Sequence, residues 1–457
     1  MSSLTHWIEI TRQQRPATLA LLTPDSNWTH AELAVLARQG SAFLRDRGLV
    51  AGDIAGIAGN ASELTIAAIA CSAANIALLT LDPLNAEARW PALQALGGGH
   101  LKRVSPLPSV LPDANSETTR NSAPDDIALI ISTSGSEGAP KAVMLTHANL
   151  DAAASASNER LSLAPGDIWL DCLPLYHIGG MSILYRCMRS GATVLLHEGF
   201  DAATVWRDLF AHPVTHISLV PAMLARLLDV AAEAPPPASL RYVLVGGAAL
   251  SGPLFKRARE AGWPICPTWG MSECAAQAAT LLQPGSDWQE GMVGTLLPGF
   301  AARLDATGRI QLRGPQLMAG YLNPEQRLGD GLDNGWLSTA DLGRISAGGE
   351  ITILGRADDV LISGGVNIHP LEVESQLAAC PGVSDVAVTA VSDPIWGDSL
   401  VALIVGTADA KAIRDWSRGH LTSAQQPRRI MRIERLPRNA MGKLERSTLR
   451  ALAGDGA

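Results

Sequence analysis

Lysine is scarce in this sequence of 457 residues, and arginine supplies most of the positive charge. The five lysines are Lys102, Lys141, Lys256, Lys411 and Lys443. Genome composition alone can produce such a bias, so the scarcity only suggests importance for the two lysines that fall within motifs. The formal net charge of −8 argues against a general nucleic-acid binder, because such proteins are usually basic.

Cysteine motifs and export or membrane signals are also lacking. The six cysteines form no CxxC pair, which argues against a zinc ribbon or a redox motif and favours buried thiols in a reducing cytosol. The first 16 residues lack the basic-then-apolar pattern of a signal peptide. The apolar residues 64–81 include Ser72, Asn75 and Thr80, so we predict a buried helix followed by a strand. We expect a cytoplasmic protein.

The chain is too long for one ordinary domain. From residue 53 onward, apolar runs alternate with helical patterns, which indicates α/β layering. Residues 104–126 are rich in Pro, Ser, Asn and Asp, as in a long surface connection. Beyond Arg356 the units become shorter, as in a small α+β domain of about 100 residues. We therefore predict an N-terminal domain over residues 1–355 and a C-terminal domain over residues 356–457.

Capping residues predict where several helices begin. Thr29 and Thr146 are suited to start helices over residues 29–48 and 146–161, and Pro221 and Ser251 to open helices after strands at 216–220 and 242–245. Further strands are expected at 53–58, 127–132 and 142–146. In the last domain we expect strands at 386–391, 400–405 and 430–434 and a helix at 408–420.

A glycine-rich loop follows the strand at 127–132 and reads Thr133-Ser-Gly-Ser-Glu-Gly-Ala-Pro-Lys141. Small residues let backbone N–H groups approach phosphate oxygens, and Lys141 adds a positive charge. It is not a Walker A loop, because Pro-Lys leads into an apparent strand rather than a helix. A flexible Gly/Ser hairpin is the alternative, but the order hydroxyl–glycine–Pro–Lys is more specific than that.

Several weaker motifs follow. They are Leu-Pro-Leu-Tyr-His177-Ile-Gly-Gly, Gly246-Gly247-Ala248, Thr-Trp269-Gly270-Met-Ser272-Glu273, Ser-Thr-Ala-Asp341-Leu-Gly, Gly-Arg356-Ala-Asp358-Asp, Ser-Gly364-Gly365-Val-Asn and Leu-Pro-Arg-Asn-Ala-Met-Gly-Lys443. Each alone fits an ordinary structural role: a core histidine, a strand-end turn, a buried tryptophan, a charged turn or an exposed terminal lysine.

In this order and spacing, the motifs resemble the signature of the acyl-adenylate-forming superfamily, which contains acyl-CoA and aryl-CoA ligases, luciferase-like enzymes and peptide-synthetase adenylation domains. The resemblance covers about residues 29–449. It implies an α/β fold: a large multi-layer N-terminal domain with αβαβα-type sheets and a small barrel, followed by a small mobile α+β domain. Glu137 and Ala340 depart from the usual threonine and glycine, and Glu137 leaves its effect on the phosphate loop open.

The resemblance implies ATP and Mg²⁺ as cofactors and assigns roles to the motif residues. Lys141, Lys443 and His177 would be catalytic, with His177 also beside the acid, and Glu273 would bind Mg²⁺, a cation that prefers oxygen ligands. Trp269 would stack on adenine, and Asp341 and Arg356 would contact the ribose or phosphate. The other implied ATP-binding residues are Thr133, Ser134, Gly135, Ser136, Gly138, Gly246, Gly247, Ala248, Gly270 and Ser272.

CoA is the implied co-substrate. Asp358 would be the hinge about which the small domain turns between half-reactions, and Gly364, Gly365 and Trp396 would contact CoA. The implied reaction converts a small-molecule carboxylic acid, with ATP, into an acyl-AMP and then an acyl-CoA thioester, releasing pyrophosphate and AMP. We expect no nucleic-acid partner and no membrane span, and a homodimer stays open.

Three stretches resemble the o-succinylbenzoate–CoA ligases of menaquinone biosynthesis and related aryl-CoA ligases: LPLYHIGG, residues 215–228 and LPRNAMGK. Arg186 then has two interpretations, a basic residue facing the succinyl carboxylate or an arginine on a helix surface. Another aryl- or medium-chain acyl-CoA ligase is an alternative. A stand-alone adenylation domain that loads a carrier protein is an alternative of a different class.

Overall fold

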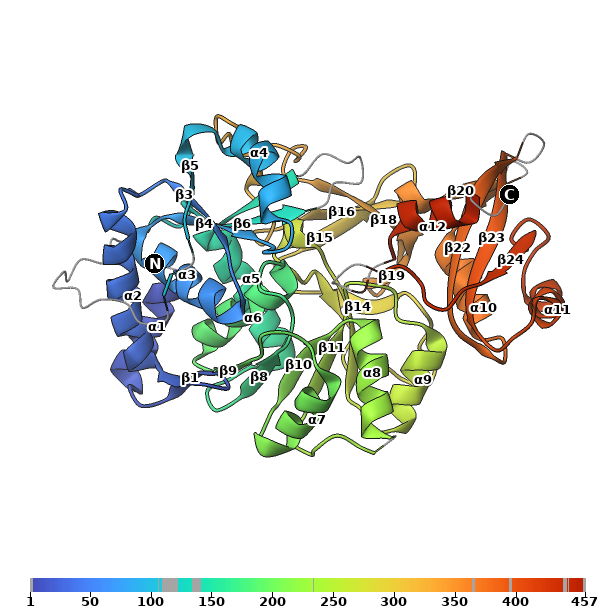
Figure 1. The fold of residues 1–457 in the computed structure, drawn as a ribbon, viewed down its shortest axis with the longest axis horizontal. Coiled ribbons are helices and arrows are strands. Elements are labelled where there is room, and N and C mark those ends of the chain that lie inside the picture. The colour runs from blue at the N-terminus through green and yellow to red at the C-terminus, as the bar shows by residue number, and fades with distance from the viewer. Residues whose placement is uncertain are drawn as a thin grey trace.

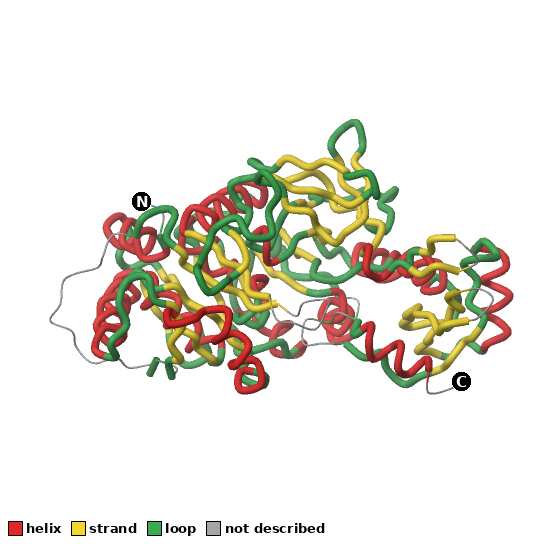
Figure 2. Tube along the Cα trace, turned by 90° about the horizontal axis from the view of Figure 1, so that it is seen from above, coloured by secondary structure: helices red, strands yellow, loops and turns green. Residues whose placement is uncertain are grey.

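The computed structural model describes residues 3–105, 107–108, 122–133, 141–232, 234–363, 366–393, 397–438, 442 and 444–454. The molecule is elongated, with a large body built from the chain up to β19 and a smaller body from the C-terminal residues at one end (Figure 1). The same division is visible from above (Figure 2).

One sheet of the large body has six strands in the order β17-β7-β6-β4-β3-β5. These strands are β3 (Ile54–Ala58), β4 (Ala77–Leu81), β5 (Leu101–Arg103), β6 (Ile127–Thr133), β7 (Lys141–Thr146) and β17 (Gly320–Tyr321). Strands β3 to β6 are parallel, whereas β7 is antiparallel to both β6 and β17. The ends of β6 and β7 therefore place Thr133 and Lys141 opposite each other.

A second sheet has thirteen strands, and its order begins at the edge with β15-β16-β18-β19-β14-β13-β12 and ends with β11-β10-β8-β9-β1-β2. Its mainly parallel part contains β1 (Leu19–Leu22), β2 (Asn27–Thr29), β8 (Ile168–Asp171), β9 (Thr193–Leu196), β10 (His216–Leu219), β11 (Tyr242–Val245) and β12 (Ile265–Trp269). The antiparallel part contains β13 (Ala279–Thr280), β14 (Met292–Leu296), β15 (Ala301–Leu304), β16 (Arg309–Arg313), β18 (Leu337–Ile345) and β19 (Glu350–Arg356).

Helices begin where the capping residues predicted. Thr29 caps α2 (His30–Asp46) in a capping box with Glu32, and Thr146 caps α5 (His147–Leu161). Ser251 caps α9 (Gly252–Glu260), and Pro221 is the first residue of α8 (Pro221–Ala231). The other helices of the large body are α1 (Leu4–Gln14), α3 (Ala61–Ala74), α4 (Ala86–Gly97), α6 (Ile178–Ser190) and α7 (Ala202–Ala211).

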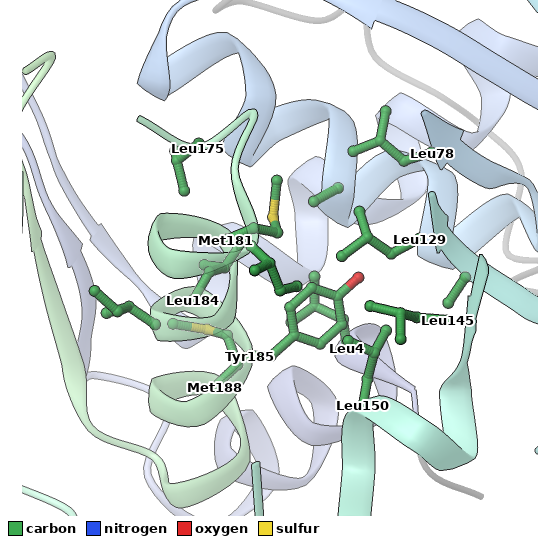
Figure 3. Close-up of a cluster of buried hydrophobic side chains, with 14 of the residues drawn as sticks. Leu4, Leu78, Leu129, Leu145, Leu150, Leu175, Met181, Leu184, Tyr185 and Met188 are labelled. Carbon is green, nitrogen blue, oxygen red and sulfur yellow. The ribbon is translucent and has the colours of Figure 1, made fainter. Parts of the chain in front are cut away.

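The main hydrophobic core lies between the two sheets. Helix α5 packs on β7, α6 packs on β8 and β9, and the two helices contact each other. Figure 3 shows the centre of this core, where Met181, Leu184, Tyr185 and Met188 of α6 face apolar side chains from β4, β6, β7, α5 and α1. Tyr185 is 3% exposed, and α6 contacts α1 and α5 as well as β8 and β9, so the helix is held within the core. This anchoring matters for function because α6 begins directly after His177.

The predicted helix-then-strand pair at residues 64–81 is confirmed as α3 and β4, both almost completely buried. Within the described part of the chain, none of the helices has the length and apolar content needed to cross a bilayer. All six cysteines are buried and unpaired.

The small body contains a separate sheet in the order β21-β20-β23-β22, with β24 beside β23. Its strands are β20 (Leu361–Ser363), β21 (Val366–Ile368), β22 (Val383–Asp393), β23 (Gly397–Gly406) and β24 (Arg429–Arg432). Helices α10 (Pro370–Ala378), α11 (Ala410–His420) and α12 (Arg446–Gly454) pack around it. These elements confirm the α+β pattern predicted for the last hundred residues.

Candidate active site

The strands beside the glycine-rich loop bring Lys141 next to Tyr321. Thr133 Oγ1 donates a hydrogen bond to the Lys141 carbonyl at 3.4 Å, which ties the end of β6 to the start of β7. The Lys141 ammonium lies 5.3 Å from the ring centroid of Tyr321 on the neighbouring strand β17. A cation over an aromatic face at this distance is attracted by the ring quadrupole. Lys141 is exposed and free to reach a ligand beyond the ring.

Glu273 is held against the same tyrosine. It lies in a short 3₁₀ turn, Ser272–Cys274, directly after β12. The Tyr321 hydroxyl donates to Glu273 Oε1 at 2.8 Å, and the Met318 N–H donates to the Glu273 carbonyl at 2.8 Å. The structure therefore assembles the predicted phosphate-binding lysine and the predicted metal-binding carboxylate around one aromatic side chain.

Trp269 and Asp341 form a second pair of predicted site residues. The indole Nε1–H of Trp269 donates to Asp341 Oδ2 at 2.8 Å, across 72 residues of sequence. Trp269 is only 8% exposed. Its predicted stacking on adenine stays a prediction, and the contact that the structure describes is the one that orients the Asp341 carboxylate.

Arg356 and Asp358 form a bidentate ion pair at the end of β19. Arg356 Nε and Nη2 donate to the two Asp358 oxygens at 2.9 Å and 2.7 Å. Burial opposes ionisation of Asp358, but the hydrogen bonds and charge of Arg356 outweigh it and lower the pKa of the carboxyl. Arg356 also pairs in register with Asp341 on β18, so the predicted hinge adjoins the predicted ribose-binding carboxylate.

Glycines permit close backbone contacts along the predicted adenine segment. A Cβ added to Gly246 would lie 2.7 Å from Thr268 Cγ2, and one added to Gly270 would lie 1.9 Å from the Ala276 carbonyl oxygen. Side chains at these positions would push β11, β12 and the following turn apart. Ala248 and Ser272 are partly exposed beside these glycines in the sequence.

Gly442, the residue before Lys443, contacts the large body. A Cβ added to Gly442 would lie 3.1 Å from Val220 Cγ2, and one added to Gly247 would lie 3.3 Å from Val220 Cγ1. Val220 immediately precedes α8. The C-terminal lysine motif therefore approaches the same residue as the predicted adenine-binding glycines.

His177 occupies the N-cap position of α6, half-buried, with its ring 4.8 Å from the ring of Tyr176. The Tyr176 carbonyl accepts a hydrogen bond from Thr80 Oγ1 at 3.2 Å, which links this segment to β4 of the other sheet. A Cβ on Gly180 would lie 2.8 Å from the Leu173 carbonyl oxygen, so a glycine is required for the tight entry into the helix. His177 is thus placed between the two sheets.

Arg186 is 4% exposed, so its interpretation as a helix-surface arginine is wrong. Its guanidinium lies 5.3 Å from the ring centroid of Trp169. Burial lowers the pKa of Arg186 to about 10, and the neighbouring Asp171 carboxyl only partly opposes this shift. Burial also raises the pKa of Asp171 well above its usual range. Asp171 Oδ1 accepts from the Leu173 N–H at 3.1 Å, whereas Oδ2 has no hydrogen-bond partner within the described ranges.

Eight predicted site residues lie outside the described residues: Ser134, Gly135, Ser136, Gly138, Gly364, Gly365, Trp396 and Lys443. Across the residues that are described, no group of three or more His, Cys, Asp or Glu side chains is arranged to hold a metal ion. A single carboxylate such as Glu273 still fits Mg²⁺, because this ion usually combines one or two carboxylates with substrate phosphates and water.

The sequence analysis did not identify Tyr321 or Glu290. Tyr321 belongs to a two-residue strand without a recognisable pattern, and its partners lie 48 and 180 residues away. Glu290 accepts a hydrogen bond from the Gly252 N–H at the start of α9, and the nearby Ser375 hydroxyl of α10 in the small body acts to lower the pKa of Glu290. Both roles depend on long-range contacts that a local motif does not contain.

Comparison with known proteins agrees with the family resemblance seen in the sequence motifs. The family model for AMP-binding enzymes matches residues 90–322, and the model for the AMP-binding enzyme C-terminal domain matches residues 372–443. The chain is 31% identical to the 2-succinylbenzoate–CoA ligase of Bacillus subtilis (strain 168), covering 97% of both chains.

Two solved structures of the o-succinylbenzoate CoA synthetase (MenE) from Bacillus subtilis are also similar. The complex with the acyl-adenylate intermediate OSB-AMP gives a TM-score of 0.88 at 31% identity, with 97% of each chain covered. A double mutant bound to the product analogue OSB-NCoA gives 0.72 at 31% identity, with 97% of this chain and 98% of that chain covered. Both family models and the near-complete alignment show that the chain belongs to the AMP-binding enzyme family.

Proposed function

We propose that this protein is an AMP-forming 2-succinylbenzoate–CoA ligase, an enzyme of menaquinone biosynthesis. Two groups of contacts among the predicted site residues carry the proposal: Tyr321 contacts both Lys141 and Glu273, and Trp269 hydrogen-bonds Asp341. The near-complete similarity to 2-succinylbenzoate–CoA ligases supports the choice of acid.

In the first half-reaction, a carboxylate oxygen of the acid attacks the α-phosphorus of ATP. The bond to the bridging oxygen breaks, and pyrophosphate leaves with the electron pair. Lys141 and the loop hydroxyls bind the departing phosphates, and Lys443 offsets the charge that develops at the α-phosphate. Glu273 would hold Mg²⁺, and this ion would offset the negative charge of the phosphates. The contact of Gly442 with Val220 supports the role of Lys443 in this step.

In the second half-reaction, the CoA thiolate attacks the acyl carbonyl, and AMP leaves from the tetrahedral intermediate. Residues 356–457 act as the mobile domain, residues 1–355 as the ATP- and acid-binding domain, and Asp358 as the hinge. The Arg356–Asp358 ion pair must loosen or turn with the hinge. Gly364, Gly365 and Trp396 would then bind CoA, while His177 would move to admit the thiol.

The second carboxylate of the acid requires a cation. Arg186 is the candidate from sequence, and its burial would make an ion pair with a carboxylate strong. We place the reaction in the cytoplasm because ATP and CoA are available there.

A panel assay tests the proposal. Purified protein is incubated with ATP, Mg²⁺ and 2-succinylbenzoate, simple benzoates or fatty acids, and pyrophosphate release is followed with and without CoA. We expect pyrophosphate with 2-succinylbenzoate, and thioester only when CoA is added. Activity confined to benzoates or fatty acids would refute the choice of acid and favour another acyl-CoA ligase. Acyl transfer to a carrier protein but not to CoA would favour the adenylation-domain alternative.

A further inference from the structure

Tyr321 connects two candidate catalytic groups that come from different parts of the chain. Its hydroxyl donates to Glu273 Oε1 at 2.8 Å, and its ring centroid lies 5.3 Å from Lys141 Nζ. Glu273 follows a strand of the thirteen-strand sheet, whereas Lys141 begins a strand of the six-strand sheet. The tyrosine therefore bridges the two sheets at the point where the proposed function requires both groups.

Backbone pairing fixes the tyrosine relative to each partner. Tyr321 on β17 lies opposite Val143 on β7. Lys141 lies two residues before Val143 and so shares its face of the sheet, which makes Lys141 the diagonal neighbour of Tyr321. On the other side, the bond from the Met318 N–H to the Glu273 carbonyl ties the chain just before β17 to the 3₁₀ turn.

The ring itself is held in place by a close backbone approach. A Cβ added to Gly331 would lie 2.5 Å from Cε2 and 2.6 Å from Cδ2 of Tyr321, and Gly331 has a φ of +84°. The Tyr321 hydroxyl is a neutral donor, and its hydrogen bond to Glu273 Oε1 leaves the charge of the carboxylate unchanged.

We propose that Tyr321 is a positioning residue that holds the Glu273 carboxylate in the orientation needed for Mg²⁺ and supports the Lys141 ammonium over its ring. The inference rests on the proposed function, since that function makes Glu273 the metal ligand. A neutral donor on one carboxylate oxygen restricts rotation without removing the negative charge. Partners of this kind typically change metal affinity by 10–100-fold.

The test is calorimetric binding of α,β-methylene-ATP, an analogue that is not cleaved at the α-phosphate, with and without Mg²⁺. Tyr321→Phe keeps the ring and removes only the hydroxyl. We expect about tenfold weaker Mg²⁺ binding to the enzyme–nucleotide complex and unchanged nucleotide affinity without Mg²⁺. Tyr321→Leu also removes the ring and should weaken nucleotide binding in the absence of the metal. Tyr242→Phe, on strand β11, is the matched control and should bind the nucleotide and Mg²⁺ as the wild type does.

A double-mutant cycle separates positioning from a general structural effect. In a Glu273→Gln background, Tyr321→Phe should have almost no further effect on Mg²⁺ binding. If a folded Tyr321→Phe protein bound Mg²⁺ as tightly as the wild type, the inference would be overturned. It would also be overturned if Tyr321→Phe reduced the Mg²⁺ affinity equally in the wild-type and Glu273→Gln backgrounds. If Tyr321→Phe does not fold, Gly331→Ala provides the comparison. Gly331 lies in an exposed loop, and its added methyl group would displace the Tyr321 ring, so this variant must also weaken Mg²⁺ binding. Absence of Mg²⁺-dependent binding in the wild type would instead refute the proposed function.

Discussion

The contact between Glu290 and Ser375 predicts a way to alter one half-reaction without the other. The Gly252 N–H donates to Glu290 Oε1 in the large body, and the Ser375 hydroxyl of α10 in the small body is near enough to the same carboxyl to lower its pKa against the effect of burial. Burial raises the pKa of Glu290, and the neighbouring Glu374 raises it further. The Ser375 hydroxyl therefore stabilises a carboxylate that burial and a like charge both disfavour.

The two bodies are arranged more as in the acyl-adenylate complex of a relative than as in its product-analogue complex. Over nearly equal coverage, the structure matches the acyl-adenylate complex of the Bacillus subtilis relative with a TM-score of 0.88 and the product-analogue complex with 0.72. Gly442 also contacts Val220 in this arrangement. The Glu290–Ser375 contact should thus favour acyl-AMP formation over thioester formation.

Replacing Ser375 with alanine removes this polar contact between the bodies and leaves the Gly252 contact in place. A hydrogen bond to a charged group contributes about 1.5 kcal/mol, so the orientation equilibrium should shift by about tenfold. If each half-reaction rate is proportional to the population of its own orientation, the ratio of the two rates measures this equilibrium directly. We expect the rate of acyl-AMP formation divided by the rate of thioester formation to fall by about tenfold.

Two single-turnover measurements give the ratio: pyrophosphate release from ATP and acid, and thioester formation from supplied acyl-adenylate and CoA. Ser384→Ala is the matched control, because the Ser384 hydroxyl donates only to the Val405 carbonyl within the small body. An unchanged ratio in Ser375→Ala, or equal slowing of both steps, would refute the proposed role of the contact.

Two further predictions concern stability and nucleotide binding. Burial lowers the pKa of His216 to about 4. Between pH 6.5 and pH 4 the unfolded chain therefore binds more protons than the folded chain. The free energy of unfolding should consequently decrease as the pH falls through this range. Urea unfolding should show that His216→Gln reduces the stability lost between pH 7.5 and pH 5 by about 2 kcal/mol; an unchanged pH dependence would contradict this. Trp269→Phe removes the donor to Asp341, so KM for ATP should rise by roughly tenfold while KM for the acid stays constant; equal increases in both would contradict the assignment.

Local signals predicted much of the secondary structure. Thr29, Thr146 and Ser251 each accept the backbone N–H expected of an N-cap, so the helices after them begin as predicted. These signals work because a cap involves residues only three apart. The hydrophobic pattern likewise predicted α3 and β4, which are buried on nearly all sides.

The contacts that assemble the site could not be predicted in this way. Sheet order joins strands from distant parts of the chain, as when β17 pairs with β7 or β1 with β9. Arg186 illustrates the same limit, since its sequence allowed either a surface or a buried position, and only the packing of α6 between the sheets decides for burial.

The two predicted site carboxylates share one physical feature. Asp341 accepts from the Trp269 indole and Glu273 accepts from the Tyr321 hydroxyl, so both are oriented by neutral aromatic donors. An arginine in either position would orient the carboxylate as well, but it would also satisfy its charge, as Arg356 does for Asp358. A neutral donor does not offset the negative charge of the carboxylate, so a carboxylate held in this way still attracts a cation or accepts hydrogen bonds from hydroxyl groups. This difference supports the proposed roles, in which the carboxylate paired with arginine lies at the hinge and the two held by aromatic residues bind ligands.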